Sequence, residues 1–216
     1  MTIKTRVILF NKPYGIPSTF TDELGRETLK AYIPVEGVYA AGRLDLDSEG
    51  LLVLTDNGSL NHRLTDPILH LPKTYLVQVE GTVTADMLSA LQSGVMIQGV
   101  ATRRCKVMEV PTPDLPDRSK PVTPHGLTTW LRVEIEEGRK RQIRHMTAAV
   151  GLPTLRIVRI AMGRLHLGEL KPGEWRLLTD DEIRLLNDSL NKTSSPAHGA
   201  GGKVNHSHKT TNRGGN

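Results

Sequence analysis

Residues 41–55 of the chain read AGRLDLDSEGLLVLT, a charged segment between two apolar runs. The runs cover 38–41 and 51–54, and the second ends at the turn signal Asp56-Asn57-Gly58. Short apolar runs bounded in this way predict two strands of a buried sheet with a loop between them. The loop carries one guanidinium and three carboxylates, namely Arg43, Asp45, Asp47 and Glu49. Charge beside core strands is costly unless it is used, so the loop is either a functional site or a solvated turn with an Arg–Asp ion pair.

The composition limits the class of protein. The chain has 216 residues, with 28 Lys and Arg against 23 Asp and Glu. This length suffices for a sizeable core. No run of 18 apolar residues predicts a membrane span, and the N-terminal apolar run is too short for a signal peptide. Cys105 is the single cysteine, which excludes an intramolecular disulfide and a cysteine-based metal cluster. We therefore expect a protein of the reducing cytoplasm with no membrane association.

The rest of the chain predicts an α+β fold. Apolar patterns predict further strands over 7–10, 73–79, 128–136 and 155–162. Helices are predicted over 28–33, 57–64, 84–93, 140–150 and 180–186, with Thr84 and Thr179 as N-caps. Residues 111–126 contain five prolines and predict a long loop. Because strands and helices do not alternate regularly, we expect a mixed, largely antiparallel sheet flanked by helices.

A second group of charges lies between residues 139 and 168, a segment without a single acidic residue. Its cations are Arg139, Lys140, Arg141, Arg144, Arg156, Arg159 and Arg164. The first four fall on the predicted helix 140–150 or at its start, where residues three or four apart share a face. A patch of positive charge on structured elements favours binding of a polyanion, and arginine suits bidentate phosphate contacts. We therefore predict RNA contacts at Arg139, Lys140, Arg141, Arg156 and Arg159; an ordinary solvated helix face is the alternative.

Four segments of the chain resemble the motifs of RNA pseudouridine synthases of the RsuA/RluA type. The central one is Gly42-Arg43-Leu44-Asp45-x-x-Ser48-Glu49-Gly50-Leu51-Leu52-x-Leu54-Thr55-x-x-Gly58. The others, in the same order as in the family, are Phe10-Asn-Lys-Pro-Tyr-Gly15, Lys73-Thr-Tyr75 and Glu137-Gly-Arg-Lys-Arg-Gln-Ile-Arg-His-Met146. Together they span about residues 7–178, and the central motif is specific by itself.

The resemblance implies an enzyme that isomerises one uridine of 23S ribosomal RNA to pseudouridine, on free RNA or on an assembling large ribosomal subunit. No cofactor or metal is implied, because substrate and product are isomers. The implied fold is a mixed, largely antiparallel sheet split by a central basic cleft. We expect one catalytic domain over 1–191, acting as a monomer and without an N-terminal S4-like module. Residues 192–216 lack acidic and aromatic residues, so we expect a disordered basic tail there.

The resemblance also implies roles for individual side chains. Asp45 is the nucleophilic carboxylate, and Arg144 is its ion-pair partner. Tyr75 and Ile143 lie against the target base. Arg43 fills the space left when the uridine is extruded from folded RNA. A carboxylate can trap or stabilise an electron-poor sugar carbon, as in glycoside cleavage, which agrees with the role of Asp45.

Two other functions are compatible with parts of the sequence. A non-catalytic RNA-binding or ribosome-assembly factor would use the same fold and basic patch without chemistry. A metal-dependent glycosyl- or nucleotidyltransferase would use Asp45 and Asp47 as an Asp-x-Asp metal site. Catalysis by a thiolate is disfavoured, because no recognisable motif surrounds Cys105.

Overall fold

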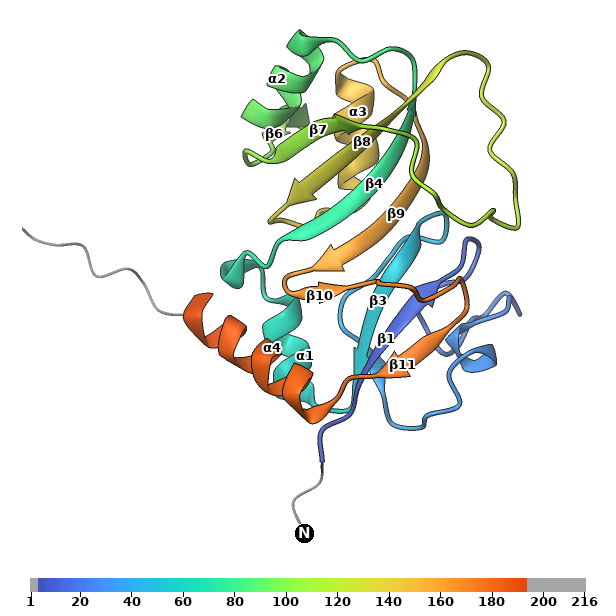
Figure 1. The fold of residues 1–216 in the computed structure, drawn as a ribbon, viewed down its shortest axis with the longest axis vertical. Helices are drawn as coiled ribbons and strands as arrows, with labels where there is room; N and C mark the ends of the chain where they lie inside the picture. The colour runs from blue at the N-terminus through green and yellow to red at the C-terminus, as the bar shows by residue number, and fades with distance from the viewer. Residues whose placement is uncertain (1–3, 194–216) are drawn as a thin grey trace, which may run out of the picture.

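The computed structural model describes residues 4–193, and the side chains of Lys192 and Thr193 are outside the description. The predicted tail therefore lies almost wholly outside the described residues. Figure 1 shows a mixed sheet with helices on both sides. Its strands follow the spatial order β11 (Trp175–Leu177), β1 (Val7–Lys12), β3 (Glu49–Thr55), β9 (Thr154–Met162), β4 (Lys73–Glu80), β8 (Thr128–Ile135) and β7 (Lys106–Val110). The short β2 (Tyr39–Ala40) pairs with β3, and β10 (Leu165–His166) pairs with β9.

Within this sheet every pairing is antiparallel except that of β3 with β9, which is parallel. The structure therefore confirms the expected mixed, largely antiparallel α+β fold. A separate hairpin joins β5 (Met96–Ile97) to β6 (Val100–Ala101). The sequence patterns did not predict β5, β6, β7, β10 or β11; four of these have two or three residues, and β7 is largely exposed.

The helices begin close to the predicted residues, and all but the last also end close to them. They are α1 (Gly58–Thr65), α2 (Ala85–Ser93), α3 (Gln142–Ala149) and α4 (Asp180–Thr193), with single turns η1 (Leu29–Ala31) and η2 (Pro67–Leu69). Thr84 accepts a hydrogen bond from the backbone N–H of Met87, as the predicted N-cap requires. Thr179 accepts one from the N–H of Glu182, but α4 continues well past the predicted end at Leu186.

Two apolar clusters cover the two faces of the sheet. Alternate residues of β1 and β3 enter different clusters: Leu52 and Leu54 pack on one side, and Leu51 and Val53 on the other. The first cluster packs against α2 and α3, and the second against α1 and α4. Burial on both faces explains why residues 51–54 of β3 are apolar without interruption.

The parallel contact between β3 and β9 is short and very close. It joins Glu49 to Val158 and Gly50 to Arg159. A Cβ atom added to Gly50, whose φ is +99°, would lie 2.3 Å from the carbonyl oxygen of Arg159. Glycine at this position thus lets the two parts of the sheet meet, directly beside the loop that carries Asp45.

Candidate active site

Asp45 lies in the loop between β2 and β3, and residues 15–18 hold this loop in place. The Ser18 hydroxyl accepts a hydrogen bond from the N–H of Leu44 and donates one to its carbonyl oxygen, at 3.0 and 2.8 Å. The N–H of Gly15 donates to the carbonyl oxygen of Leu46 at 2.8 Å. Backbone groups on both sides of Asp45 are thereby fixed, as a positioned catalytic side chain requires.

The Asp45 loop opens into a cavity of about 730 Å³. Of the predicted site residues, the cavity wall contains Arg43, Asp45, Tyr75, Arg139, Lys140, Arg141, Ile143 and Arg159. Its other charged residues are Arg26, Lys73, Glu136 and Glu137. The wall therefore carries more cations than carboxylates, as a site for a polyanion would.

The Asp45 carboxylate is available for chemistry. Within residues 4–193 it accepts no hydrogen bond and forms no ion pair. Tyr75 on β4 and Ile143 on α3 are 9% and 5% exposed and supply flat and aliphatic surfaces in the same cavity. A flat base can stack on such surfaces, beside a carboxylate that is free to attack a sugar carbon.

The expected ion pair between Arg144 and Asp45 was wrong. The guanidinium of Arg144 lies 3.2 Å from the carboxylate of Asp47 and donates to the carbonyl oxygens of Asp47 and Thr154. The loop places Asp45 and Asp47 in different cavities, and Arg144 lines the second, smaller one with Asp47. Spacing in the sequence could not distinguish two carboxylates only two residues apart.

Asp47 is held by two arginines. Arg141 donates two hydrogen bonds to its carboxylate, each 3.0 Å long, and the guanidinium of Arg144 lies 3.2 Å from Oδ2 of the same carboxylate. Burial acts to raise the pKa of Asp47, but Arg141 and Arg144 outweigh it and hold the pKa below its ordinary value. A carboxylate engaged in this way is a poor metal ligand, which argues against the Asp-x-Asp metal site.

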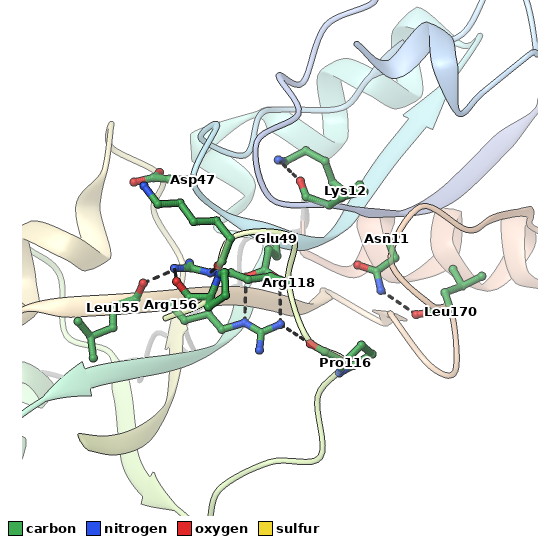
Figure 2. A network of polar contacts seen from close by, with 12 residues as sticks. Asn11, Lys12, Asp47, Glu49, Pro116, Arg118, Leu155, Arg156 and Leu170 are labelled. Carbon is green, nitrogen blue, oxygen red and sulfur yellow. Dashed lines mark hydrogen bonds and ion pairs between the residues drawn. The ribbon is translucent and has the colours of Figure 1, made fainter. Parts of the chain in front are cut away.

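Arg156 is not positioned to contact RNA, contrary to expectation. It is 8% exposed, and its guanidinium donates to both oxygens of Glu49, at 2.8 and 2.9 Å, and to the carbonyl oxygen of Pro116 (Figure 2). Arg118, from the same long loop, donates to the carbonyl oxygen of Leu155. Arg156 thus forms a structural ion pair with Glu49, and its bond to Pro116 fixes the loop 111–126 beside the junction of β3 and β9.

The remaining predicted RNA contacts differ in how free their side chains are. Arg139 donates to the carbonyl oxygens of Val100 and Ala101 and lies 3.4 Å from Glu137, so its guanidinium is largely committed to the β5–β6 hairpin. Arg43 and Lys140 are exposed, and their charged groups contact no carboxylate among the described residues. These two side chains are the best placed to meet phosphates at the mouth of the cavity.

Known proteins resemble this chain over most of its length. The sequence profile of the RNA pseudouridylate synthase family matches residues 6–149. The chain belongs to this family. It is 51% identical over 173 residues to ribosomal large subunit pseudouridine synthase E of Vibrio parahaemolyticus, covering 79% of this chain and 73% of that one. It is 50% identical over 176 residues to the protein of the same name from Xanthomonas campestris, covering 79% and 94%.

A solved structure described as a pseudouridylate synthase has the same fold as this synthase. It superposes with a TM-score of 0.70 at 30% sequence identity, covering 85% of this chain and 74% of the other. The family isomerises uridine to pseudouridine, so the chain is an enzyme of the isomerase class. The motif resemblance is confirmed, and so is the family it indicated.

Sequence reasoning missed Lys12, which supports the Asp45 loop of the synthase. Lys12 has no exposed surface, and its ammonium donates to the carbonyl oxygens of Pro13 and Ile16 at 2.9 and 2.7 Å. Burial lowers the pKa of Lys12 to about 8, although Glu49, Asp47 and Asp45 favour the charged form. By holding the turn that contains Gly15, Lys12 supports the segment that fixes the Asp45 loop.

Two further residues of the synthase bear on its chemistry. Burial raises the pKa of the Cys105 thiol to about 11, and the thiol donates to the carbonyl oxygen of Leu91. Such a thiol is inert near neutral pH, which disfavours thiolate catalysis. Lys73, which sequence reasoning also missed, lines the Asp45 cavity from β4.

No helix within residues 4–193 is long and apolar enough to span a membrane.

Proposed function

We propose that this synthase isomerises a specific uridine of 23S ribosomal RNA and that Asp45 is its nucleophile. The two relatives of about 50% identity are named for the large ribosomal subunit, which supports the choice of RNA. The observation that carries the proposal is the Asp45 carboxylate, free of partners and set in a cavity with Tyr75 and Ile143. We further expect a monomer that acts in the cytoplasm, on free 23S RNA or on an assembling large subunit.

The side chains divide the work of the reaction. Asp45 attacks or stabilises C1′ of the ribose while the bond from C1′ to N1 of uracil breaks. Tyr75 and Ile143 hold the detached base between them, so that it can turn and present C5 to C1′. No net oxidation occurs, because one glycosidic bond replaces another.

The wall of the cavity supplies the RNA contacts. A uridine within folded RNA must leave its stack before Asp45 can reach it. Arg43, exposed at the cavity, fills the vacated position, and Lys140 meets the flanking phosphates. Arg141 contributes less, because both of its terminal nitrogens already donate hydrogen bonds to Asp47.

The substrate is tested by incubating the purified chain with unmodified 23S RNA, unmodified 16S RNA and assembled large subunits. Pseudouridine is then mapped by carbodiimide modification and primer extension. We expect one new pseudouridine in 23S RNA and none in 16S RNA. Modification of 16S RNA alone, or of several unrelated 23S positions at similar rates, would contradict the proposed substrate.

A further inference from the structure

Arg159 on β9 is a buried cation without a compensating carboxylate. Its side chain is almost fully enclosed, the residue being 2% exposed, and its Nε donates to the carbonyl oxygen of Leu51 at 2.7 Å. Within residues 4–193 it forms no ion pair, and its Nη2 is a buried donor without a hydrogen-bond partner. Arg156, three residues earlier on the same strand, is also buried, but its guanidinium donates to both carboxylate oxygens of Glu49. An unmatched buried charge is costly, so Arg159 is suited to receive negative charge that arrives or develops on the substrate.

A second cation stands beside Arg159 in the same cavity wall. Lys73 on β4 lines the cavity, and among the described residues its ammonium donates only to the carbonyl oxygen of Leu71, at 3.1 Å. Burial, and then the positive charge of Arg159, lower the pKa of Lys73 to about 8. Lys12 shows the contrasting case, since two carbonyl oxygens satisfy it outside the cavity. Two neighbouring cations without a carboxylate create a positive potential in this part of the cavity.

The position of Arg159 indicates which part of the substrate it meets. Arg159 pairs with Tyr75 across β4 and β9, so the two side chains leave the sheet on the same face. Both line the cavity with Asp45. An extruded nucleotide inserts its base deepest while its phosphates follow the strand at the mouth, where the exposed Arg43 and Lys140 lie. The enclosed Arg159 is therefore beside the base.

We propose that Arg159, assisted by Lys73, donates hydrogen bonds to a carbonyl oxygen of the target uracil and stabilises the negative charge that the base carries once it has left C1′. This rests on the proposed reaction at Asp45. The electron pair of the N1–C1′ bond leaves with N1, and its charge spreads over the uracil oxygens. The base turns, and C5 gives an electron pair to C1′ while the bond from C1′ to Asp45 breaks and its electron pair returns to the carboxylate. The proton on C5 departs and N1 takes up a proton, so the product is an isomer of the substrate. A fixed guanidinium stabilises the charge as it develops.

The test uses Arg159→Met in the full-length chain and an RNA that the wild-type chain modifies. Single-turnover rate constants are measured at saturating RNA, with binding measured separately. Removing one such donor costs about 10²–10³-fold in rate in comparable sites, and we expect a loss of that size with RNA affinity changed less than about threefold. Arg132→Met, on an exposed arginine of β8, is the matched control and should leave both unchanged.

The contacted group is identified by changing the RNA. One set of substrates carries 2-thio- or 4-thiouridine at the target, and another carries uncharged methylphosphonates on either side of it. Sulfur accepts hydrogen bonds weakly, so one thio substitution should slow the wild-type chain yet add nothing to the loss in Arg159→Met. The methylphosphonate effects should be the same in both proteins. A methylphosphonate effect that vanishes in Arg159→Met, with additive thio effects, would make Arg159 a phosphate contact and overturn the assignment.

Two controls separate the possible failures. If thermal unfolding shows that Arg159→Met does not fold, Lys73→Gln takes its place, because this variant keeps the hydrogen bond from Arg159 to Leu51. Lys73→Gln should lose about tenfold in rate and show a smaller thio effect. Normal saturated rates in both variants would overturn the assignment while leaving the synthase activity intact. A wild-type chain that forms no pseudouridine in any ribosomal RNA would overturn the proposed function and this assignment together.

Discussion

Asp45 and Asp47 lie two residues apart in one loop and face different cavities, and this separation divides their tasks. Asp45 accepts no hydrogen bond from the described residues, whereas the Asp47 carboxylate pairs with both Arg141 and Arg144. Both arginines come from the segment that begins α3. Asp47 thus ties the Asp45 loop to α3, while Asp45 stays free to react.

Replacing Asp47 with Asn should therefore lower stability. The change keeps the shape but leaves Arg141 and Arg144 without a counter-charge. Because Asp47 and Arg141 are partly exposed, we expect a loss of about 1–2 kcal/mol, below the 3–5 kcal/mol of a fully buried pair. Urea unfolding at pH 7 measures it.

The pH dependence gives an independent check on Asp47. Its folded pKa lies below the unfolded value, so the stability it contributes is present above the unfolded pKa and is lost as the pH falls toward the folded pKa. The difference between wild type and Asp47→Asn should shrink as the pH falls below the ordinary carboxyl pKa of 3.8. A difference that is constant over this range would show that the two arginines do not depress the pKa of Asp47.

A second pH dependence, at alkaline pH, is predicted for Lys73. Its pKa of about 8 in the folded chain lies below the ordinary value of 10.5, because burial and Arg159 disfavour the charged form. Between these values the unfolded chain binds more protons, so this group makes stability rise with pH from about 8 to 10.5. The wild type should gain stability relative to Lys73→Met over this interval. Parallel stability curves for the two proteins would contradict a depressed pKa.

The junction of β3 and β9 is the element on which the site depends. Gly50 sits at the close contact with Arg159, and the preceding Glu49 pairs with Arg156. An alanine at position 50 would place its Cβ against backbone atoms of Arg159 at a positive φ. Backbone cannot move aside as the end of a flexible side chain can.

Gly50→Ala should therefore cost at least about 3 kcal/mol, which is a fall in melting temperature of roughly 6–12 °C for a chain of this size. Gly58→Ala, at the start of α1 with nothing near its added Cβ, is the matched control. It should be neutral or stabilising by about 0.5–1 kcal/mol. Equal melting temperatures for the two variants would show that the junction is not as tight as described.

Elements with a strong local pattern could be predicted from the sequence, and those made by tertiary contacts could not. The cap at Thr84 and the strand that begins at Lys73 follow from local residue types and alternation. In contrast, β11 forms because it pairs with β1 across more than 160 residues, and nothing local marks it. The same holds in the site: a motif identified Asp45, but the partner of Arg144 depends on how the loop turns.

On the scale of the whole molecule, the exposed and committed cations of the basic cluster predict different effects on RNA binding. Arg43→Ala and Lys140→Ala should each weaken RNA affinity and reduce the slope of log affinity against log salt by about one. Arg156→Met should leave that slope unchanged, because Glu49 already pairs with this guanidinium. Filter binding at several salt concentrations distinguishes these cases. A reduced slope for Arg156→Met alone would reverse our assignment of free and structural cations.

The most direct test of the function is made in cells that lack this chain. Pseudouridines are mapped in their 23S RNA, and again after supplying either the wild-type chain or Asp45→Asn at equal protein levels. We predict that one pseudouridine is lost, that the wild-type chain restores it, and that Asp45→Asn does not. Restoration by Asp45→Asn, or a 23S RNA in which no pseudouridine depends on the chain, would contradict the account.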